Sequence, residues 1–490
     1  MRFAAVSLIV FSGFVTAAPP PELAALQKLV HQVIDTAEPS VACILVSRSK
    51  EYAEFGEGPT SQSSGRLGGF NVSRHSRLAD GPRRDLVRRL DLANPDTVPE
   101  SYGSGIVIDA NGLVLTNFHV IDRATKVFVR LPGQNRGSYA DVMAADGRAD
   151  LAVLKLIVPP VDLKALRLGD GAKIRKGDWV VALANPFAAG FRDGSPSASW
   201  GIVANLRRRA PGPSDEAKRV RPLSQYGTLL QTDARLNLGC SGGALLNLDG
   251  EVIALTTALA AIAGGETAGG YAIPIDANVK KMVEVLKRGE EIEYGFLGVT
   301  VGSDAKVDTG GVRITDVAAG MPAARAGLYV GDIVAAINGN PVREQDDLFV
   351  NIAAAMAGSD IEIDVVRGTR TTRVKARLTK SSAAGDIPPP IVSNRPKPVH
   401  GLRVEYGSTL ATGSNPPEGV LIRELEPNSP AAKKLKDWLD KGPQLIITAV
   451  NGEPVPAPTD FYRVAAGKAS VTLDIVELGN EASRKKVTLP

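Results

Sequence analysis

The sequence of 490 residues is poor in cysteine, histidine and aromatic residues, and its net charge is small. Its two cysteines, Cys43 and Cys240, are too few for a disulfide scaffold, a four-cysteine zinc site or an iron–sulfur cluster. The formal net charge of +4 gives no reason to expect nucleic acid as the main partner. Any chemistry that needs an imidazole depends on four candidates: His31, His75, His119 and His400.

Long hydrophobic runs are absent except at the N-terminus, where residues 1–18 read MRFAAVSLIVFSGFVTAA. Arg2 precedes an apolar run from Phe3 to Val15, and small residues follow, which predicts a signal peptide over residues 1–17. The run is shorter than the roughly 20 residues of a membrane-spanning helix, although an uncleaved anchor or a buried N-terminal element would look similar. We therefore expect export without a stable membrane span: to the periplasm if the source is a diderm bacterium, and otherwise secretion.

Glycine and proline, by contrast, are abundant, with 50 and 33 copies. They separate short runs rich in β-branched residues, which predict strands. The clearest runs are Val41–Ser47, Gly105–Asp109, Lys126–Leu131, Leu151–Leu156, Trp179–Ala184 and Glu251–Thr257. Many short strands with tight turns favour an antiparallel barrel or sandwich over a βαβ fold. A helix is predicted over Ile275–Lys287, where apolar residues recur at helical spacing.

Two irregular stretches interrupt the strand pattern. Residues 51–100 are rich in Gly, Ser and Arg, and residues 207–221 are basic. We expect the first to be a solvated surface loop, with a regulatory or subunit-contacting role as the alternative. A joint polyanion-binding surface has less support, because aromatic residues are not interleaved with the basic ones.

The C-terminal half contains a repeat. GVRITDVAAGMPAA at 311–324 resembles GVLIRELEPNSPAA at 419–432, and INGNPV at 337–342 resembles VNGEPV at 450–455. The first pair is offset by 108 residues and the second by 113, so the second copy has five extra residues between its landmarks. Two copies are too few for a solenoid and predict tandem domains. The Pro-rich residues 381–398 predict a semi-rigid linker between them.

Three short segments of the first half carry residues suited to nucleophilic catalysis: LTNFHV at 115–120, DGRADLAVLKL at 146–156 and NLGCSGGAL at 237–245. A hydroxyl nucleophile such as Ser241 needs a base, here His119, and the base needs an orienting group, here Asp150. Gly239 and Gly242 allow the unusual backbone that presents two N–H groups to an oxyanion. Each segment alone also suits a structural role. Together they follow the His, Asp, Ser order of chymotrypsin-like double barrels.

On these segments the sequence resembles the HtrA/DegP-like family of exported serine proteases, in which a trypsin-like domain precedes two PDZ domains. ANPF at 184–187, GIV at 201–203 and YAIP at 271–274 match further landmarks of that family. The resemblance implies a mainly β fold: a chymotrypsin-like double β-barrel protease domain followed by two PDZ domains. The implied boundaries are 23–287 for the protease domain with its long insertion at 51–100, 291–380 and 399–490 for the PDZ domains, and 381–398 for the linker.

The resemblance also implies roles for individual residues. Ser241 would attack the scissile carbonyl, His119 would take its proton, and Asp150 would hold the imidazole. The backbone N–H groups of Gly239 and Ser241 would form the oxyanion hole. Leu236 would line an apolar substrate pocket that favours small or medium aliphatic side chains. No metal and no cofactor is implied.

Two positions depart from the family pattern. Cys240 stands where the family usually has asparagine, which would alter how readily the oxyanion loop reaches its active shape. Because Ser241 fills the nucleophile position, Cys240 is not the expected nucleophile, and a disulfide with Cys43 is a minor alternative. Arg235 stands where a small residue is common. We expect Arg235 to point to solvent, the alternative being an Arg-lined pocket that prefers acidic side chains.

The first repeat contains EYGFLGV at 293–299, which resembles the carboxylate-binding loop of PDZ domains. Gly295, Phe296, Leu297 and Gly298 would form this loop. VHGLRV at 399–404 takes the equivalent place in the second repeat but lacks the aromatic residue and the second glycine. A purely structural role is open for both repeats.

The resemblance implies unfolded or misfolded exported proteins as substrates, C-terminal peptides as ligands of the first PDZ domain, and a homotrimer or larger homo-oligomer. It also implies that peptide binding regulates the protease. The rival hypothesis is a catalytically weak or inactive chaperone or scaffold that binds clients through its PDZ domains. A third hypothesis is a regulator tethered to a polyanion by the Arg-rich loops.

Overall fold

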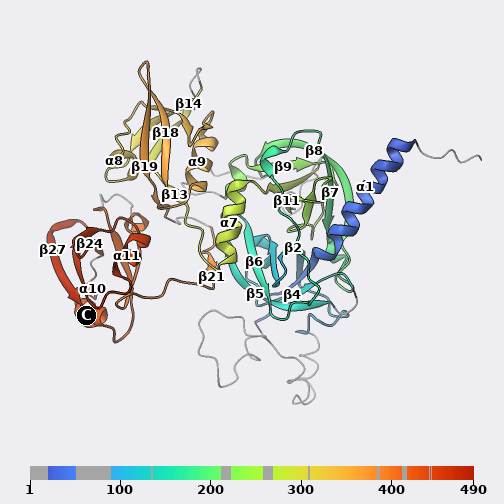
Figure 1. The fold of residues 1–490 in the computed structure, drawn as a ribbon, viewed down its shortest axis with the longest axis horizontal. Helices are drawn as coiled ribbons and strands as arrows, with labels where there is room; N and C mark the ends of the chain where they lie inside the picture. Colours follow the sequence, from blue (N-terminus) through green and yellow to red (C-terminus); the bar gives the residue numbers. More distant parts are fainter. Residues whose placement is uncertain are drawn as a thin grey trace, which may run out of the picture.

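The computed structural model contains two β-barrels followed along the chain by two smaller sheets and a two-stranded sheet of β13 (Gly295–Phe296) and β20 (Thr379–Lys380) (Figure 1). It describes residues 20–50, 90–133, 136–210, 222–257, 269–306, 310–382, 387–410, 417–440, 442 and 444–490. The predicted signal peptide, most of the insertion at 51–100 and residues 211–221 lie outside the described residues. Within the described ranges, no helix is both long enough and apolar enough to cross a bilayer.

The first barrel has six antiparallel strands in the order β5-β4-β1-β2-β3-β6 and closes through a β5–β6 pairing. The strands are β1 (Val41–Ser47), β2 (Ser101–Asp109), β3 (Leu113–Thr116), β4 (Lys126–Arg130), β5 (Gly137–Asp146) and β6 (Leu151–Leu156). Every residue of β1 is buried. Ala42, Ile44 and Val46 belong to one apolar cluster, and Cys43 and Leu45 to another, so both faces of this strand are covered.

The second barrel is closed in the order β10-β11-β12-β9-β8-β7. Its strands are β7 (Trp179–Ala184), β8 (Ser197–Arg208), β9 (Leu229–Thr232), β10 (Ala244–Leu246), β11 (Val252–Thr257) and β12 (Gly270–Pro274). Helix α7 (Ala277–Lys287) follows, and the carboxylate of Asp276 caps it by accepting a hydrogen bond from the Val279 amide. The helix packs against β5 and β6, so it joins the second barrel to the first.

The short apolar runs predicted most of these elements well. The predicted strands at 41–47, 151–156 and 179–184 coincide with β1, β6 and β7, and the other predicted elements differ at one end by one to four residues. The sequence pattern did not predict helix α1 (Pro21–Ala37), which packs on β7 and extends away from the barrels at its N-terminal end (Figure 1). Val33 and Ala37 are its buried residues, and Val30 and Ile34 pack partly buried against the core, so apolar residues do recur at helical spacing along this helix although it was not among the predicted elements.

The two small sheets have the same strand order. The first is β14 (Val299–Lys306), β15 (Val312–Val317), β16 (Ile333–Ile337), β18 (Asp360–Arg367) and β19 (Arg370–Arg377), with β17 (Asn340–Pro341) paired to β16. The second is β22 (Leu402–Tyr406), β23 (Val420–Leu425), β24 (Leu445–Val450), β26 (Val471–Glu477) and β27 (Asn480–Leu489), with β25 (Glu453–Pro454) paired to β24. We refer to these units as the first and second small domains.

The helices of the small domains explain the change in the repeat offset. The first small domain has α8 (Pro322–Arg325) and α9 (Gln345–Ala354), and the second has α10 (Pro430–Leu439) and α11 (Pro458–Ala465). Helix α10 has ten residues where α8 has four. The extra residues of the second copy therefore lengthen a helix and leave the strand order unchanged.

The Pro-rich stretch between the small domains is more than a linker. Two of its residues form β21 (Ile391–Val392), which pairs antiparallel with β5 at Ala145 and Ala144. β5 pairs with β4 near its start and with β6 farther along, so its last residues have an open edge that β21 covers. Two residues of the predicted linker thus add a seventh strand to the first sheet.

Candidate active site

The first barrel and the second barrel each contribute to one cleft. His119 lies on the short helix α5 (Phe118–Ile121), directly after β3, and Asp150 lies in the turn between β5 and β6. Ser241 lies on the loop between β9 and β10 of the second barrel. The three residues predicted from separate sequence segments are therefore brought together across the barrel interface.

The side chains of these residues form a continuous hydrogen-bonded row. His119 Nε2 is 2.8 Å from Ser241 Oγ, and His119 Nδ1 is 2.9 Å from both carboxylate oxygens of Asp150. The His119 amide also donates to Asp150 Oδ1 at 3.0 Å. Asn117 Nδ2 donates to the Asp150 carbonyl at 2.9 Å, which fixes the backbone of the aspartate as well as its side chain. This geometry allows the imidazole to take a proton from the hydroxyl while the carboxylate holds its other nitrogen.

The environment of His119 favours its protonated form. Burial alone would lower the pKa of His119, but the charge of Asp150 and the hydrogen bond to it outweigh burial and raise the pKa above its ordinary value of 6.5. An imidazole with a raised pKa is a stronger base toward the serine proton.

The loop before Ser241 depends on two glycines. Gly239 and Gly242 have φ of +92° and +87°, in the region that side chains disfavour. A Cβ on Gly242 would lie 2.1 Å from the Ser104 carbonyl oxygen, so the loop and β2 approach too closely for a side chain. The Gly239 amide donates no hydrogen bond to any of the described residues. It is therefore available to donate to an oxyanion.

Ser104 of β2 ties the serine loop to the first barrel, and sequence reasoning missed it. Its hydroxyl donates to the Gly239 carbonyl at 2.7 Å and accepts from the Asn185 amide at 2.8 Å. Its amide donates to the Ser241 carbonyl at 2.7 Å. A serine inside a strand carries no local signal of such a role, because its partners are more than 80 residues away along the chain.

Cys240 is a buried free thiol, and so is Cys43. Burial raises the pKa of Cys240, and a hydrogen bond from the Asn237 amide to its Sγ, 3.3 Å long, opposes this effect. Burial raises the pKa of Cys43 to about 12. In this structure the two cysteines form no disulfide. Cys240 also lines a cavity of about 110 Å³ behind the loop, together with Leu236 and Arg235.

Leu236 and Arg235 lie on the strand-like segment that leads to the serine loop. The half-buried Leu236 side chain lies directly against Gly270 of β12, where a Cβ would be 2.2 Å from its Cδ1. Arg235 is exposed, and its carbonyl accepts a hydrogen bond from Ser199 Oγ at 3.1 Å. The apolar Leu236, rather than the Arg235 guanidinium, therefore packs into the barrel beside the site.

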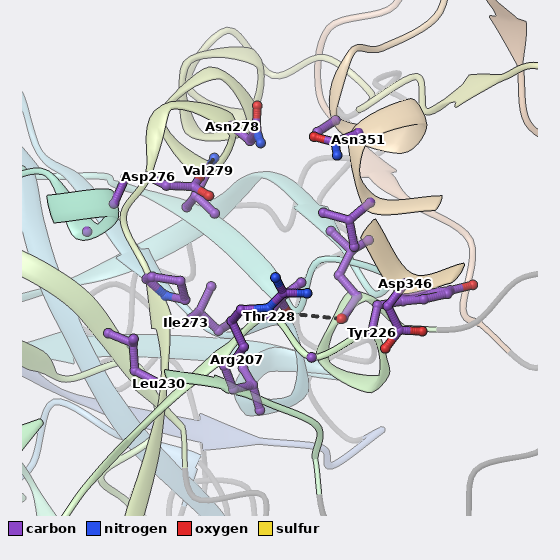
Figure 2. A pocket seen from close by; sticks show the side chains of 18 of the residues that line it. Arg207, Tyr226, Thr228, Leu230, Ile273, Asp276, Asn278, Val279, Asp346 and Asn351 are labelled. Atoms are coloured by element: carbon purple, nitrogen blue, oxygen red, sulfur yellow. Dashed lines mark hydrogen bonds between the residues drawn. The ribbon is translucent and has the colours of Figure 1, made fainter. Parts of the chain in front are cut away.

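A cavity of about 630 Å³ lies between the second barrel, α7 and α9 of the first small domain (Figure 2). The labelled side chains show its mixed character: Leu230, Ile273 and Val279 are apolar, while Thr228 and Asn351 are polar. The cavity is separate from Ser241. Its wall, however, includes Ala149 and Leu151, the neighbours of Asp150 in the chain.

The described part of the second basic stretch contacts acidic residues. Arg207 donates to Glu344 at 2.9 Å and to Asp347 at 2.6 Å, and Arg209 pairs with Asp346 at 2.8 Å. These carboxylates belong to α9 or directly precede it. The two arginines therefore bind the first small domain.

Comparisons with known proteins agree with this architecture. A family model described as a trypsin-like peptidase domain matches residues 103–255, and a model described as a PDZ domain matches residues 295–378. The fold and the site together define a trypsin-like serine peptidase with an attached PDZ domain, and the predicted double-barrel fold class is confirmed. The PDZ model matches one of the two small domains.

Similar curated proteins identify the family. The periplasmic pH-dependent serine endoprotease DegQ of Escherichia coli K12 is 32% identical over 409 residues, which cover 80% of this chain and 82% of DegQ. The periplasmic serine endoprotease DegP of Salmonella typhimurium is 32% identical over 393 residues, covering 78% of this chain and 75% of DegP. The chain belongs to the HtrA/DegP family of serine endoproteases. A solved structure of the HtrA-type protease AlgW with a tripeptide has 25% identity and a TM-score of 0.49, covering 72% of this chain and 98% of that one.

Proposed function

We propose that the protein is an exported serine endopeptidase that degrades unfolded or misfolded proteins through Ser241, His119 and Asp150. The observation that carries the proposal is the unbroken row of contacts, 2.8 Å from Ser241 Oγ to His119 Nε2 and 2.9 Å from Nδ1 to the Asp150 carboxylate. The family shows the enzyme class, and this row supplies a nucleophile, a base and an orienting group in the required order.

The proposed mechanism has two steps. Ser241 Oγ attacks the peptide carbonyl as His119 accepts its proton, and the amides of Gly239 and Ser241 stabilise the oxyanion. His119 then gives the proton to the leaving amine, which leaves an acyl-enzyme that water hydrolyses by the same route in reverse. Leu236 would line the pocket for the substrate side chain, and its close packing on Gly270 favours small or medium aliphatic residues.

The first small domain is proposed to bind C-terminal peptides at Gly295, Phe296, Leu297 and Gly298. Two features support this role. β14, which follows this loop directly, is the edge strand of its sheet, and α9 lies beside it, so an extended peptide can add as a further strand. Phe296 is exposed whereas Leu297 is buried, so the loop presents one apolar side chain outward and anchors the other. Peptide binding there is proposed to regulate the protease.

The second small domain is proposed to be a second PDZ domain. Its strand order is the same as that of the first, and β22 is likewise an edge strand. The loop before β22 differs from its counterpart, because His400 has a φ of +52° and its Nδ1 is 2.9 Å from the Pro490 carbonyl oxygen. His400 therefore acts as a loop residue held by the C-terminus, and peptide binding by this domain has less support.

The proposed location is the periplasm, because the relatives DegQ and DegP are named periplasmic and residues 1–17 have the composition of a signal peptide. We also propose a homotrimer or larger assembly. On the second barrel, Trp179 and Trp200 are exposed and stack with ring centroids 4.8 Å apart. Exposed apolar side chains of this size are the kind that a neighbouring subunit covers.

The decisive experiment is digestion of casein by the mature chain beside the Ser241→Ala variant, purified identically. We expect cleavage by the wild type alone, which also excludes a contaminating protease. If neither protein cuts casein, even with a C-terminal peptide added for the first small domain, the proposal is overturned and a client-binding scaffold becomes the better description. If both proteins cut to the same extent, the observed activity does not come from Ser241.

A further inference from the structure

The turn that carries Asp150 is held in an unfavourable conformation. Asp150 has a φ of +56°, in the left-handed region that a residue with a side chain seldom adopts. Such a conformation persists only where the surrounding structure holds it, and it lies here at the residue that contacts His119. The contacts that fix residues 147–150 therefore bear on the alignment of the His119 imidazole.

One of these contacts comes from far along the chain. Asp146, at the end of β5, accepts a hydrogen bond from the Ala149 amide at 2.7 Å and another from the Tyr294 hydroxyl at 2.5 Å, both at Oδ1. Asp146 and Tyr294 are 5% and 7% exposed, so water does not compete for these bonds. Tyr294 lies in the segment between α7 and the first small domain, 148 residues from Asp146.

The ring of Tyr294 makes a second contact with the same turn. The Arg148 guanidinium lies over it, 4.3 Å from the ring centroid. The hydroxyl of Tyr294 thus holds the residue before the turn, and its ring holds a residue inside it. The carbonyl of Arg148 accepts a hydrogen bond from the Leu223 amide at 2.8 Å, which is a further contact of the turn.

The turn also borders a cavity. Ala149 and Leu151, which flank Asp150, line the cavity of about 630 Å³ shown in Figure 2. Ala149 and Leu151 are themselves buried in the apolar core, so the cavity reduces the packing around the turn but does not remove it. The contacts from Tyr294 are therefore more important here than they would be in a fully packed site.

We propose that Tyr294 is a positioning residue for catalysis, whose hydroxyl and ring hold the 147–150 turn so that Asp150 stays aligned with His119. This inference rests on the proposed role of Asp150 in the catalytic row. Tyr294 also directly precedes the loop at Gly295–Gly298, and its carbonyl accepts a hydrogen bond from the Ser381 amide at 2.8 Å. The residue that fixes the catalytic turn is therefore also anchored in the first small domain.

The protonation states fit this arrangement. Burial, followed by the charge of Asp146, raises the pKa of Tyr294 well above its usual value, so its hydroxyl stays protonated and can donate. Burial raises the pKa of Asp146, and the hydrogen bond from Tyr294 opposes this effect. Neither group needs to lose or gain a proton for the hydrogen bond to hold the turn near neutral pH.

The test is Tyr294→Phe in the mature full chain, which keeps the ring beside Arg148 and removes only the hydroxyl. With a short chromogenic peptide, we expect kcat to fall about 10- to 100-fold while KM changes less than about twofold. The variant should also displace Asp150, which would then raise the pKa of His119 less than it does in the wild type. The acidic limb of the pH profile of kcat/KM should therefore move to lower pH. A purely structural tyrosine would not move this limb.

Tyr406→Phe is the matched control. Tyr406, in β22, is 2% exposed and its hydroxyl lies near Gly358, so the change removes a phenol hydroxyl of a buried tyrosine that does not contact the 147–150 turn. We expect wild-type kcat and an unshifted pH profile. If Tyr294→Phe behaves like this control, or loses activity through KM alone, the proposal is overturned.

A second pair of variants serves if Tyr294→Phe does not fold. Asp146→Asn keeps the Oδ1 acceptor for Tyr294 and Ala149, whereas Asp146→Ala removes it. We expect Asp146→Asn to retain most of the kcat that Asp146→Ala loses, and equal losses would contradict the proposal. Wild type and Ser241→Ala are assayed alongside: failure of that pair to differ overturns the proposed function itself, not only the role of Tyr294.

Discussion

The first barrel fixes His119 and Asp150 with side-chain hydrogen bonds from several directions, whereas the second barrel presents Ser241 on a loop shaped by glycine. That loop is also not held by its own barrel alone, because Ser104 of the first barrel donates hydrogen bonds to the carbonyls of Gly239 and Ser241. The proposed base is thus built into one barrel, and the proposed nucleophile is positioned by the contact between the two barrels. Substitutions beside His119 and Asp150 should therefore affect activity differently from substitutions that displace the Ser241 loop.

The largest effect on the first barrel's side is expected for Asp150→Asn. The change keeps the size of the side chain but removes the charge that raises the pKa of His119. The new amide can also hydrogen-bond the wrong tautomer of the imidazole. We expect kcat to fall by about 10⁴-fold and the acidic limb of the pH profile to move to lower pH. Steady-state kinetics on a chromogenic peptide measure both. Asp249→Asn, on an exposed turn, is the control, and a loss below tenfold for Asp150→Asn would show that the base does not depend on this carboxylate.

On the second barrel's side, Gly242→Ala should cost about 100-fold or more in kcat/KM. The new Cβ would meet the Ser104 carbonyl oxygen at 2.1 Å and Thr116 Oγ1 at 2.4 Å, so the serine loop must move away from the first barrel. Gly250→Ala is a close control, because Gly250 also has a positive φ but has nothing within 4 Å of the added Cβ. Kinetics and thermal unfolding of both variants separate backbone strain from displacement of the loop. Equal effects would mean that strain alone matters.

Ser104→Ala tests the bond between the barrels directly. It removes the donor to the Gly239 carbonyl and leaves the Asn185 amide without its acceptor, which should destabilise the fold by about 1–3 kcal/mol. We expect kcat to fall about 10-fold as the oxyanion loop loosens. Ser138→Ala removes a hydroxyl that likewise donates to one carbonyl and accepts from one amide, but in β5. If Ser138→Ala loses as much stability as Ser104→Ala but keeps its kcat, the loss of activity is specific to Ser104. If the two variants have the same kinetics, Ser104 has no special role in holding the serine loop.

The smallest effect is expected for Cys240→Asn, which installs the residue usual in the family. The one hydrogen bond that the Cys240 side chain makes among the described residues, from the Asn237 amide to Sγ, is weak. Because a neutral hydrogen bond contributes about 1 kcal/mol, kcat should change by no more than about fivefold. Comparing casein digestion and peptide hydrolysis by this variant and by Cys43→Ser checks this. A large gain of activity would mean that Cys240 keeps the oxyanion loop out of its active shape.

The strands and the residues of the catalytic row could be predicted because their signals are local. Short β-branched runs bounded by glycine mark β1, β6 and β7, and the segments around His119, Asp150 and Ser241 each carry a recognisable pattern. The sequence also marked the two glycines whose positive φ values shape the serine loop.

The features that could not be predicted depend on contacts between distant segments. β21 has only two residues, too few for any periodicity, and exists because β5 offers an edge. The hydrogen bonds of Tyr294 and Ser104 join residues more than 80 positions apart, and neither residue type is unusual in its local setting. The cavity beside Asp150 likewise arises from how α7 and α9 meet the second barrel.

Because β21 pairs with β5, only a short stretch of free chain connects the first barrel to the second small domain. Beyond β21 the chain is held as far as Asn394, whose amide donates to the carbonyl of Gly289, just after α7, and β22 begins at Leu402. The seven intervening residues can span at most about 25 Å. A polypeptide captured by the second small domain would therefore stay within a short radius of the barrels, and its effective concentration at the cleft would be set by this tether and not by diffusion.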